Sequence, residues 1–488
     1  MQSLASFVPL RLAGAGALLA VSTFCQSPLQ TGNLVLVRVG DGTATINSNT
    51  QAVYLDEVDA AGNLVQSLAL PTTTVGNQRQ FTIRGGAGSE GYLNLSPNGQ
   101  WLTLAGYDTP PLSPLSATEG SPAATTPRVI ARIDRFTGQV DTSTALVDAY
   151  DGSATIQGNV RSAITDDGNR FWLSGTGAAQ TAGIRFVAAL GDSTSIQVSA
   201  GAPTNTRVVG TFDGQLYMTS ASTVYLGVCS IGQGMPTTSG QLSTLLTGFP
   251  TSGGTSAGSA YGFFFADPNT LYVADDNTSA ASQNGGIGKW TQSGGVWTRQ
   301  YVLRLNGPTA TTGMRGLTGF VRDGVATLWA TANTAGQTTT TLVTVTDTGP
   351  NSLVVPLATS AANTQWKSVQ FLPKPPAHFR VPAACGTADI AVYGNGEVGT
   401  QLRAQVSQSL GFPILGISLN PAQQSFCGCT LIHDFAVMAF GGAASLSLPN
   451  DPALFGLAVF FQGADFLAPG GCPNPQFALT DGIVVSVQ

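Results

Sequence analysis

Charge is what this sequence has least of. Asp, Glu, Lys and Arg together make up 9% of its 488 residues, against about 25% in an average soluble protein. The net charge of −6 argues against the basic surface that non-specific nucleic-acid binding requires. We therefore expect no nucleic-acid partner. Hydrophobic residues make up 42% and glycine occurs 60 times, which is the composition of a turn-rich, all-β exported protein rather than a disordered chain.

Histidine is also scarce. The two histidines, His378 and His433, both lie beyond residue 373. The chain before that point therefore cannot hold a Ser-His-Asp triad, a histidine-ligated metal or a histidine general base. P-loop and HExxH motifs are absent as well. We predict no catalytic residue, no cofactor and no metal site.

Acidic pairs are few and have structural explanations. They are Asp56-Glu57, Asp166-Asp167 and Asp275-Asp276. The second pair is best explained as part of a hairpin turn. For Asp275-Asp276 a solvated strand end is favoured over a calcium ligand pair.

Long hydrophobic runs are missing except near the N-terminus. Arg11 precedes an apolar run, Leu12 to Val21, which is too short to span a bilayer. Ala20-Val21-Ser22 is a small-x-small cleavage candidate, so residues 1–25 are predicted to be a signal peptide. Cys25 suggests lipidation as the alternative, but the bulky Phe24 favours simple cleavage. We expect no transmembrane segment after cleavage, and a location outside the cell or in the cell envelope or periplasm.

Cysteines are concentrated near the C-terminus. Cys229 stands alone and is expected to be a small buried hydrophobe. The remaining cluster is Cys385, Cys427, Cys429 and Cys472. In an exported chain this even number favours disulfides over zinc, because Cys427-Gly428-Cys429 lacks the spacer of a zinc knuckle. Three pairings are open. We expect Cys427 and Cys429 to pair outward, one with Cys385 and one with Cys472.

A recurring β-hairpin dominates what is present. Its clearest copy, Asn159 to Gly175, has an apolar segment, an Asp-Gly turn and an aromatic-rich second segment. Variants begin near Tyr92, Arg207, Tyr261, Arg315 and Lys367. A second type of hairpin alternates with the first, giving a period of roughly 55 residues that is typical of a β-propeller. We count six blades, with seven as the alternative. The stretch 369–372 is expected to complete a blade formed by residues 33–70.

Several stretches resemble known families. Leu95-Ser96-Pro97-Asn98-Gly99-Gln100-Trp101-Leu102 and Thr270 to Asp275 resemble the repeats of bacterial surface-layer and NHL-type propellers. Residues 33–42 and 55–57 resemble an uncharacterised family of secreted bacterial propeller-like proteins. For function, these resemblances imply only secretion and binding.

A proline-rich linker divides the chain. Residues 33–373 are predicted to form the propeller and residues 374–382 the linker. Residues 383–488 are predicted to form a small disulfide-linked β-sandwich, because strand-like stretches alternate with Gly/Pro turns. The segments 452–462 and 479–482 resemble C-terminal modules of uncharacterised large secreted bacterial proteins.

One observation concerns a ligand. At matching positions that open the first hairpin of each unit stand Tyr92, Arg161, Arg207, Tyr261, Arg315 and Lys367. In a propeller these positions lie around one mouth of the central channel. Four cations and two phenols there predict a binding site for a carboxylate, a sulfate or an acidic glycan. The alternative is structural, with each side chain joining adjacent blades.

Three functions are compatible with these observations. We favour a secreted or surface binding protein that is not an enzyme, with an acidic glycan or an envelope component as its partner. The first alternative is a lyase acting on acidic polysaccharides, with a tyrosine base and arginines that neutralise the carboxylate. The second is a purely structural envelope protein. The sequence does not indicate the ligand or the oligomeric state.

Overall fold

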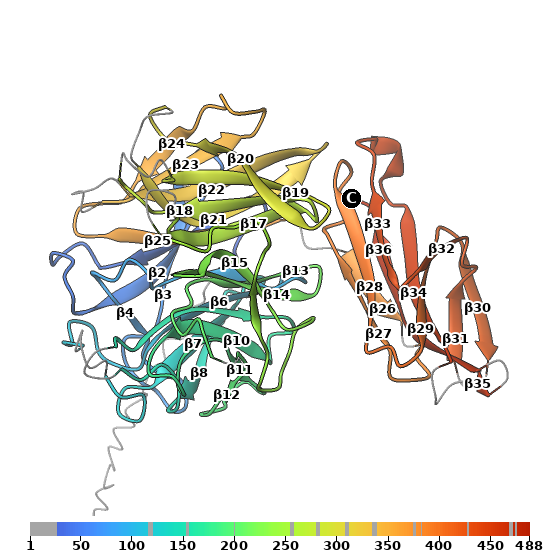
Figure 1. The fold of residues 1–488 in the computed structure, drawn as a ribbon, viewed down its shortest axis with the longest axis horizontal. Helices are drawn as coiled ribbons and strands as arrows, with labels where there is room; N and C mark the ends of the chain where they lie inside the picture. The colour runs from blue at the N-terminus through green and yellow to red at the C-terminus, as the bar shows by residue number, and fades with distance from the viewer. Residues whose placement is uncertain are drawn as a thin grey trace, which may run out of the picture.

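A computed structural model gives the positions of most of the chain. It describes residues 27–115, 121–152, 156–199, 201–253, 258–279, 284–307, 312–333, 339–373, 377–381, 383–426, 429–467, 472–473 and 476–488. The predicted signal peptide lies outside the described residues. Nearly all regular structure in the described part is β (Figure 1). No helix in it has the length and apolarity needed to cross a membrane.

Antiparallel sheets follow one another along residues 27–373. The first has the order β25 (Gln365–Phe371), β1 (Leu34–Val39), β2 (Thr50–Val58), β4 (Thr82–Arg84), β6 (Trp101–Tyr107), β7 (Arg128–Asp134) and β8 (Val140–Leu146), with β3 (Leu64–Ala69) on β2 and β5 (Asn94–Leu95) on β6. Within it, β25-β1-β2-β3 and β5-β6-β7-β8 are two four-stranded halves that β4 joins.

The next four sheets have four strands each. They are β9 (Asn159–Thr165), β10 (Phe171–Thr176), β11 (Arg185–Val187) and β12 (Ile196–Gln197); β13 (Val209–Phe212), β14 (Gln215–Ser222), β15 (Tyr225–Ile231) and β16 (Ser243–Leu245); β17 (Ala260–Asp267), β18 (Thr270–Asp275), β19 (Gly286–Ser293) and β20 (Val296–Leu303); and β21 (Gly313–Arg322), β22 (Val325–Asn333), β23 (Thr341–Thr346) and β24 (Val355–Thr359). This series of four-stranded sheets is β-propeller-like.

The hairpin β9–β10 shows why these residues form strands. Gly168 takes φ +82° at the turn, a conformation that glycine adopts without steric cost. Asp167 accepts hydrogen bonds from the backbone N–H groups of Asn169 and Arg170, at 2.7 and 2.8 Å, so the acidic pair has the turn role that the sequence predicts. A Cβ at Gly168 would lie 2.4 Å from the ring of Trp101. The turn glycine therefore also makes room for the neighbouring sheet.

The two ends of this part of the chain meet in one sheet. Strand β1 pairs with β2 on one side and with β25 on the other, with Leu34 opposite Phe371 and Leu36 opposite Val369. This is the pairing expected from the sequence. It leaves no free edge on β1 and ties the first strand to the last.

The C-terminal strands form a separate set of sheets (Figure 1, orange to red). One sheet has the order β26 (Ala377–Val381), β36 (Gln476–Ser486), β34 (Ala458–Phe466), β29 (Phe412–Ser418) and β32 (Val437–Phe440), with β35 (Cys472–Pro473) on β36. A second contains β27 (Asp389–Tyr393), β28 (Gln401–Ser407) and β33 (Ala443–Ser447), and β30 (Pro421–Phe426) pairs with β31 (Cys429–His433). A 3-10 turn, η1, spans Pro452–Leu454.

Both larger sheets contribute to one hydrophobic core. Ile390 and Leu402 from the three-stranded sheet pack with Leu415, Phe461 and Val485 from the other. Strand β26 lies inside the segment predicted to be a linker, and β32 and β30 are strands that the sequence did not suggest. Edge strands carry a weak periodic signal because they are short.

The C-terminal region contacts the hairpin turns of the propeller-like part. Arg403 donates to both carboxylate oxygens of Asp213 at 3.1 Å and lies over the Phe212 ring. The backbone N–H of Asp323 donates to the carbonyl of Gly399 at 2.9 Å. These turns follow the innermost strands, so the beginnings of those strands lie at the opposite end, away from the C-terminal region.

Candidate functional site

The predicted site residues all stand at the beginning of an innermost strand. Arg161, Tyr261, Arg315 and Lys367 lie in the first residues of β9, β17, β21 and β25, and Tyr92 and Arg207 lie two residues before β5 and β13. Each of these strands opens an antiparallel hairpin, and the hairpin turn follows its last residue. The predicted site residues therefore lie at the end of the hairpin away from the turn. These side chains contact one another or the adjacent strands.

Two tyrosines meet at the centre. The rings of Tyr92 and Tyr261 stack with centroids 5.7 Å apart, although they come from the first and fourth of the six positions. They are 2% and 5% exposed and pack against Val208. Below them lies a cavity of about 170 Å³ whose lining includes residues from β5, β9, β13, β17, β21 and β25. The innermost strands therefore surround one central cavity, and Tyr92 is part of its lining.

Two of the four cations are buried and bound to backbone carbonyls. Lys367 donates to the carbonyls of Gly85 and Ala87 at 2.7 and 3.1 Å, and Arg161 donates to that of Thr206 at 3.0 Å. Burial lowers the pKa of Lys367 to about 7, and it also lowers the pKa of Arg161, because the charged form is poorly solvated there. Arg161 thus joins β9 to the segment before β13, and Lys367 joins β25 to the residues that follow β4.

The other two cations are half-buried and flank Tyr261. The guanidinium carbon of Arg207 lies 4.0 Å from the centre of the Tyr261 ring, and that of Arg315 lies 5.6 Å from it. Arg207 donates only through Nη1, to the hydroxyl of Ser259 at 2.9 Å and the carbonyl of Ala260 at 3.1 Å. Its Nε and Nη2 have no hydrogen-bond partner among the residues that the structure describes. We call Arg207, Tyr261 and Arg315 the cation clamp.

Asp276 belongs to the same region and was not identified as part of the site from the sequence. Arg315 donates through Nε to its carboxylate at 3.0 Å, and within the described part of the chain neither Nη atom of Arg315 has a partner. The adjacent Asp275 is 9% exposed and accepts from the N–H groups of Ser259 and Asn277. The expectation of a solvated strand end is therefore wrong for Asp275, because the carboxylate caps two loop N–H groups. Burial raises the pKa of Asp275.

Two of the predicted site residues bond the next sheet at the same relative position. Arg161 bonds Asn205 and Thr206, the two residues before Arg207, and Arg207 in turn bonds the two residues before Tyr261. The structural alternative thus has direct support, since each of these arginines joins its sheet to the next one. The only sequence signal for these partners is their fixed position relative to the repeat.

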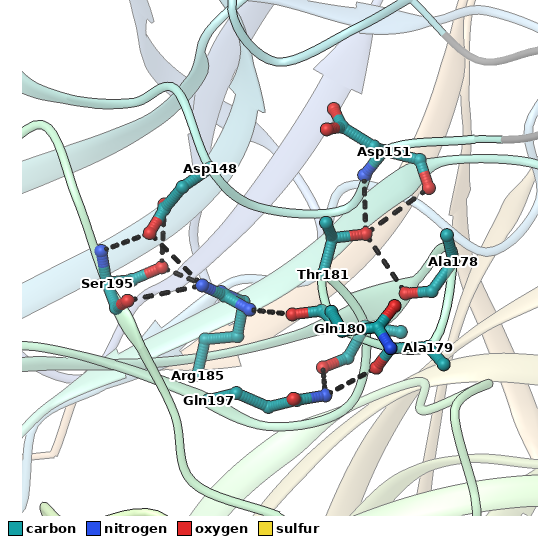
Figure 2. A network of polar contacts seen from close by, with 10 residues as sticks. Asp148, Asp151, Ala178, Ala179, Gln180, Thr181, Arg185, Ser195 and Gln197 are labelled. Atoms are coloured by element: carbon teal, nitrogen blue, oxygen red, sulfur yellow. Dashed lines mark hydrogen bonds and ion pairs between the residues drawn. The ribbon is translucent and has the colours of Figure 1, made fainter.

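A further polar network stabilises a loop at this end of the molecule (Figure 2). Arg185 uses Nε, Nη1 and Nη2 to bond Ser195, the Gln180 carbonyl and Asp148. Asp148 also accepts from the N–H and hydroxyl of Ser195 at 2.8 and 2.9 Å. Arg185 is 4% exposed, and all three nitrogens of its guanidinium are occupied. Arg207 and Arg315 differ from it in having unoccupied donors.

The tyrosines do not have the geometry of a catalytic base. Burial raises the pKa of Tyr92 and of Tyr261, whereas a base near neutral pH needs a lowered value. The Tyr92 hydroxyl is buried and has no hydrogen-bond partner among the described residues. The arginines contact the face of Tyr261 rather than its hydroxyl. No observation in the structure therefore favours the lyase mechanism.

One of the predicted cysteine contacts is present. Cys385 and Cys429 form a disulfide, as one of the expected outward pairings requires. Cys427 lies outside the described residues, and so does the side chain of Cys472, so their pairing stays a prediction. Cys229 is a buried free cysteine, as expected.

Comparison with known proteins gives distant structural similarity alone. No protein-family model and no curated protein matches the chain. Among solved structures, Trypanosoma rangeli sialidase aligns over 95% of this chain and 92% of its own at 8% identity, with a TM-score of 0.38. An exo-β-1,3-galactanase from Phanerochaete chrysosporium covers 88% and 98% at 12% identity (TM-score 0.33). A gluconolactonase from Xanthomonas campestris covers 68% and 86% at 13% identity (TM-score 0.33). These scores are too low to support a function.

Proposed function

We propose that this protein is a secreted or cell-surface binding protein whose cation clamp holds an anionic ligand. The scaffold is a six-bladed propeller, counted from the two halves of the first sheet and the four sheets that follow, and the C-terminal sheets form a sandwich. The observation that carries the proposal is the set of unoccupied guanidinium donors of Arg207 and Arg315, whose guanidinium carbons both lie within 5.6 Å of the centre of the Tyr261 ring. Guanidinium groups bind carboxylates and sulfates through paired N–H donors.

The geometry favours a small planar or tetrahedral anionic group. Tyr261 is 5% exposed, so its ring supports the arginines and offers little area for a sugar to stack on. A ligand would contact the guanidinium nitrogens that have no partner among the described residues. In Arg315 these are the two Nη atoms, because its Nε donates to Asp276. A carboxylate or sulfate at the end of a larger molecule, such as an acidic glycan, fits this requirement.

The Cys385–Cys429 bond supports export, because disulfides form and persist in oxidising compartments. Secretion itself rests on the predicted signal peptide at residues 1–25. Expression of the full-length chain with N-terminal sequencing of the product would test it. A product that begins between residues 23 and 26 and is found outside the cytoplasm is expected, and an uncleaved cytoplasmic product would contradict it.

A binding screen tests the ligand. The mature protein would be titrated with glucuronate, sulfated and sialylated glycans, each beside its neutral counterpart. We expect binding of an anionic member that Arg207→Gln and Arg315→Gln each weaken about tenfold or more, the effect of losing a charge-assisted hydrogen bond. Arg170→Gln is the matched control, because Arg170 lies at the turn end of β9 and pairs with Asp166 and Asp167.

The outcome also separates the alternatives. Binding of no acidic ligand, together with a loss of thermal stability in Arg207→Gln, would identify the clamp as a purely structural joint between sheets. Release of an unsaturated product from an acidic polysaccharide would instead indicate the lyase.

A further inference from the structure

A second cavity lies between the hairpin turns of the propeller-like part and the C-terminal sheet of β27, β28 and β33. Its volume is about 330 Å³, within the roughly 300–1,000 Å³ of small-molecule sites, which often form where two domains meet. It shares Leu95, Thr211 and Phe264 with the central cavity of about 170 Å³. It therefore lies over the turn end of the innermost strands. We call it the junction cavity.

The propeller side of the junction cavity is aromatic. Phe212 of β13, Phe264 and Phe265 of β17 and Phe320 of β21 line it. Phe212 and Phe265 stack with ring centroids 4.5 Å apart, and Phe320 stacks on Phe371 at 5.2 Å. Because the rings hold one another in place, this wall is formed before any ligand binds. Such a wall favours a ligand with a flat apolar body.

The opposite wall is one face of the C-terminal sheet. Val392 of β27 and Leu402 of β28 point into the hydrophobic core, and successive residues of a strand point to opposite faces. Tyr393, Gln401 and Arg403 therefore lie on the other face, where they line the junction cavity. Tyr393 and Arg403 lie directly opposite each other in the strand pairing. A sheet rather than a mobile loop thus positions these side chains.

The amide groups of this wall offer donors. The side-chain oxygen of Gln401 accepts from Nε of Arg403 at 3.0 Å. That of Asn395, which also lines the cavity, accepts from the N–H of Glu397 at 3.2 Å and from the Thr400 hydroxyl at 3.0 Å. A guanidinium and a backbone N–H only donate, so each amide must present its NH₂ group elsewhere. Neither NH₂ group has a partner among the described residues. A ligand that bonds them must supply acceptor oxygens.

The described lining of the junction cavity has no net charge. Asp213 and Arg403 are its two charged residues, and both carboxylate oxygens accept from Nη1 of the arginine at 3.1 Å. A charged ligand would enter without a counter-ion and lose its hydration. We propose that the junction cavity binds an uncharged, flat apolar molecule that carries carbonyl or ether oxygens. This ligand class differs from that of the cation clamp, which lies at the opposite end of the innermost strands.

Two larger hollows connect the junction cavity with solvent. Their volumes are about 820 and 740 Å³, and Tyr393 lines both of them as well as the junction cavity. Gln405 lines the two hollows but not the junction cavity, and its side chain is exposed. A small molecule can therefore reach the junction cavity along the face of β28.

Equilibrium dialysis of the mature protein against three naphthalene probes tests the ligand class. Naphthalene has no acceptor, methyl naphthyl ketone adds a neutral carbonyl, and naphthoate adds a carboxylate to the same ring. We expect saturable binding of the ketone, about fivefold or more tighter than that of naphthalene, which is the effect of one net hydrogen bond. Naphthoate should bind more weakly than the ketone in Arg207→Gln, which removes binding at the clamp. No saturable binding of the ketone, or tighter binding of naphthoate in that variant, would overturn the proposal.

Four variants locate the site. Gln401→Glu and Asn395→Asp keep the accepting oxygen and remove the NH₂ donor, so each should reduce the preference for the ketone over naphthalene. Gln405→Glu is the matched control, because it makes the same change on the same face of β28 outside the cavity. Thr211→Phe should fill the cavity and abolish binding of both probes. An unchanged ketone preference in Gln401→Glu and Asn395→Asp would contradict the assigned donors, and unchanged binding in a folded Thr211→Phe would contradict the site.

Discussion

Arg207 places its guanidinium 4.0 Å from the centre of the Tyr261 ring, and Arg315 approaches the same ring to 5.6 Å. Two cations thus share one aromatic side chain that is almost fully buried. A cation over an aromatic face is stabilised by the ring quadrupole, by up to about 2 kcal/mol where water is excluded. The ring of Tyr261 therefore holds both arginines in place.

This relationship predicts different effects for two substitutions at Tyr261. Tyr261→Phe keeps the ring and should bind the anionic ligand within about twofold of the wild type. Tyr261→Leu removes the ring and should weaken binding at least tenfold, because the loss of two contacts is worth roughly 1–3 kcal/mol. Calorimetric titration measures both. Equal affinities for the two variants would show that the ring has no role in positioning the arginines.

Lys367 gives a pH dependence in the neutral and basic range. Burial lowers its pKa to about 7 in the folded chain, while the unfolded value is about 10.4. The folded state therefore binds fewer protons above pH 7, and stability increases as the pH rises. We expect the free energy of unfolding of this part to increase by roughly 2–3 kcal/mol from pH 6 to pH 9.

Lys367→Met should remove most of that increase. Thermal unfolding at several pH values would measure it, with Arg170→Gln as the control that keeps the wild-type slope. A wild-type stability that does not change over this range would mean that the lysine keeps an ordinary pKa. It would then be solvated more fully than its contacts with Gly85 and Ala87 suggest.

Much of the fold could be predicted because each hairpin carries its own local signal. The Asp-Gly turn at Gly168 and the alternation around Trp172 are sufficient to place β9 and β10. The pairing of β25 with β1 could be predicted as well, since an incomplete set of strands at each end of the repeat requires it. Strands β26 and β32 were missed because five and four residues carry too little periodicity.

The candidate site was only partly predictable. Equal repeat positions identified six residues, but they could not show that Arg161 and Lys367 are buried while Arg207 and Arg315 are half-buried. That difference depends on the carbonyls and carboxylates of the adjacent sheet. Asp276 was identified from the sequence only as half of an acidic pair, because its contact with Arg315 joins residues 39 apart in sequence.

His433 predicts acid sensitivity of the C-terminal region. Its side chain is fully buried, and burial lowers its pKa to about 4, although Asp434 acts in the opposite direction. Since the unfolded value is about 6.5, the unfolded state binds more protons between pH 4 and 6.5, and stability is lost as the pH falls through that range. The loss should reach about 3 kcal/mol.

His433→Asn should reduce this loss, because its side chain does not titrate and still offers an acceptor where the ring Nδ1 receives the Phe435 N–H at 2.9 Å. The unfolding transition of the C-terminal region at pH 4.5 and pH 7 would be compared in both proteins. Parallel losses in the wild type and the variant would assign the acid sensitivity to other groups.

Arg403 predicts how firmly the two parts of the chain are joined. Its side chain is 10% exposed where it contacts Asp213, and burial raises the pKa of that carboxyl. Arg403→Ala leaves Asp213 without its cation and should expose residues 374–382 to faster proteolysis. Arg322→Ala is the matched control. The Arg322 side chain that pairs with Glu397 is 52% exposed, and exposed ion pairs contribute little to stability. Similar cleavage rates for both variants would contradict an anchoring role for Arg403.

The disulfide predicts the largest single loss of stability in the C-terminal region. Cys385 and Cys429 are 44 residues apart, and closing a loop of that length restricts the unfolded chain by about 4 kcal/mol. Cys385→Ser should therefore lower the melting temperature of this region by many degrees, and the propeller-like part should melt as before. Cys229→Ser, which removes a free thiol, is the control. Cys427 and Cys472 remain as possible partners for Cys429 in the single variant. We expect Cys429 to stay unpaired there, so the double variant Cys385→Ser with Cys429→Ser should match the single one. A further loss in the double variant would reveal that Cys429 finds another partner once Cys385 is removed.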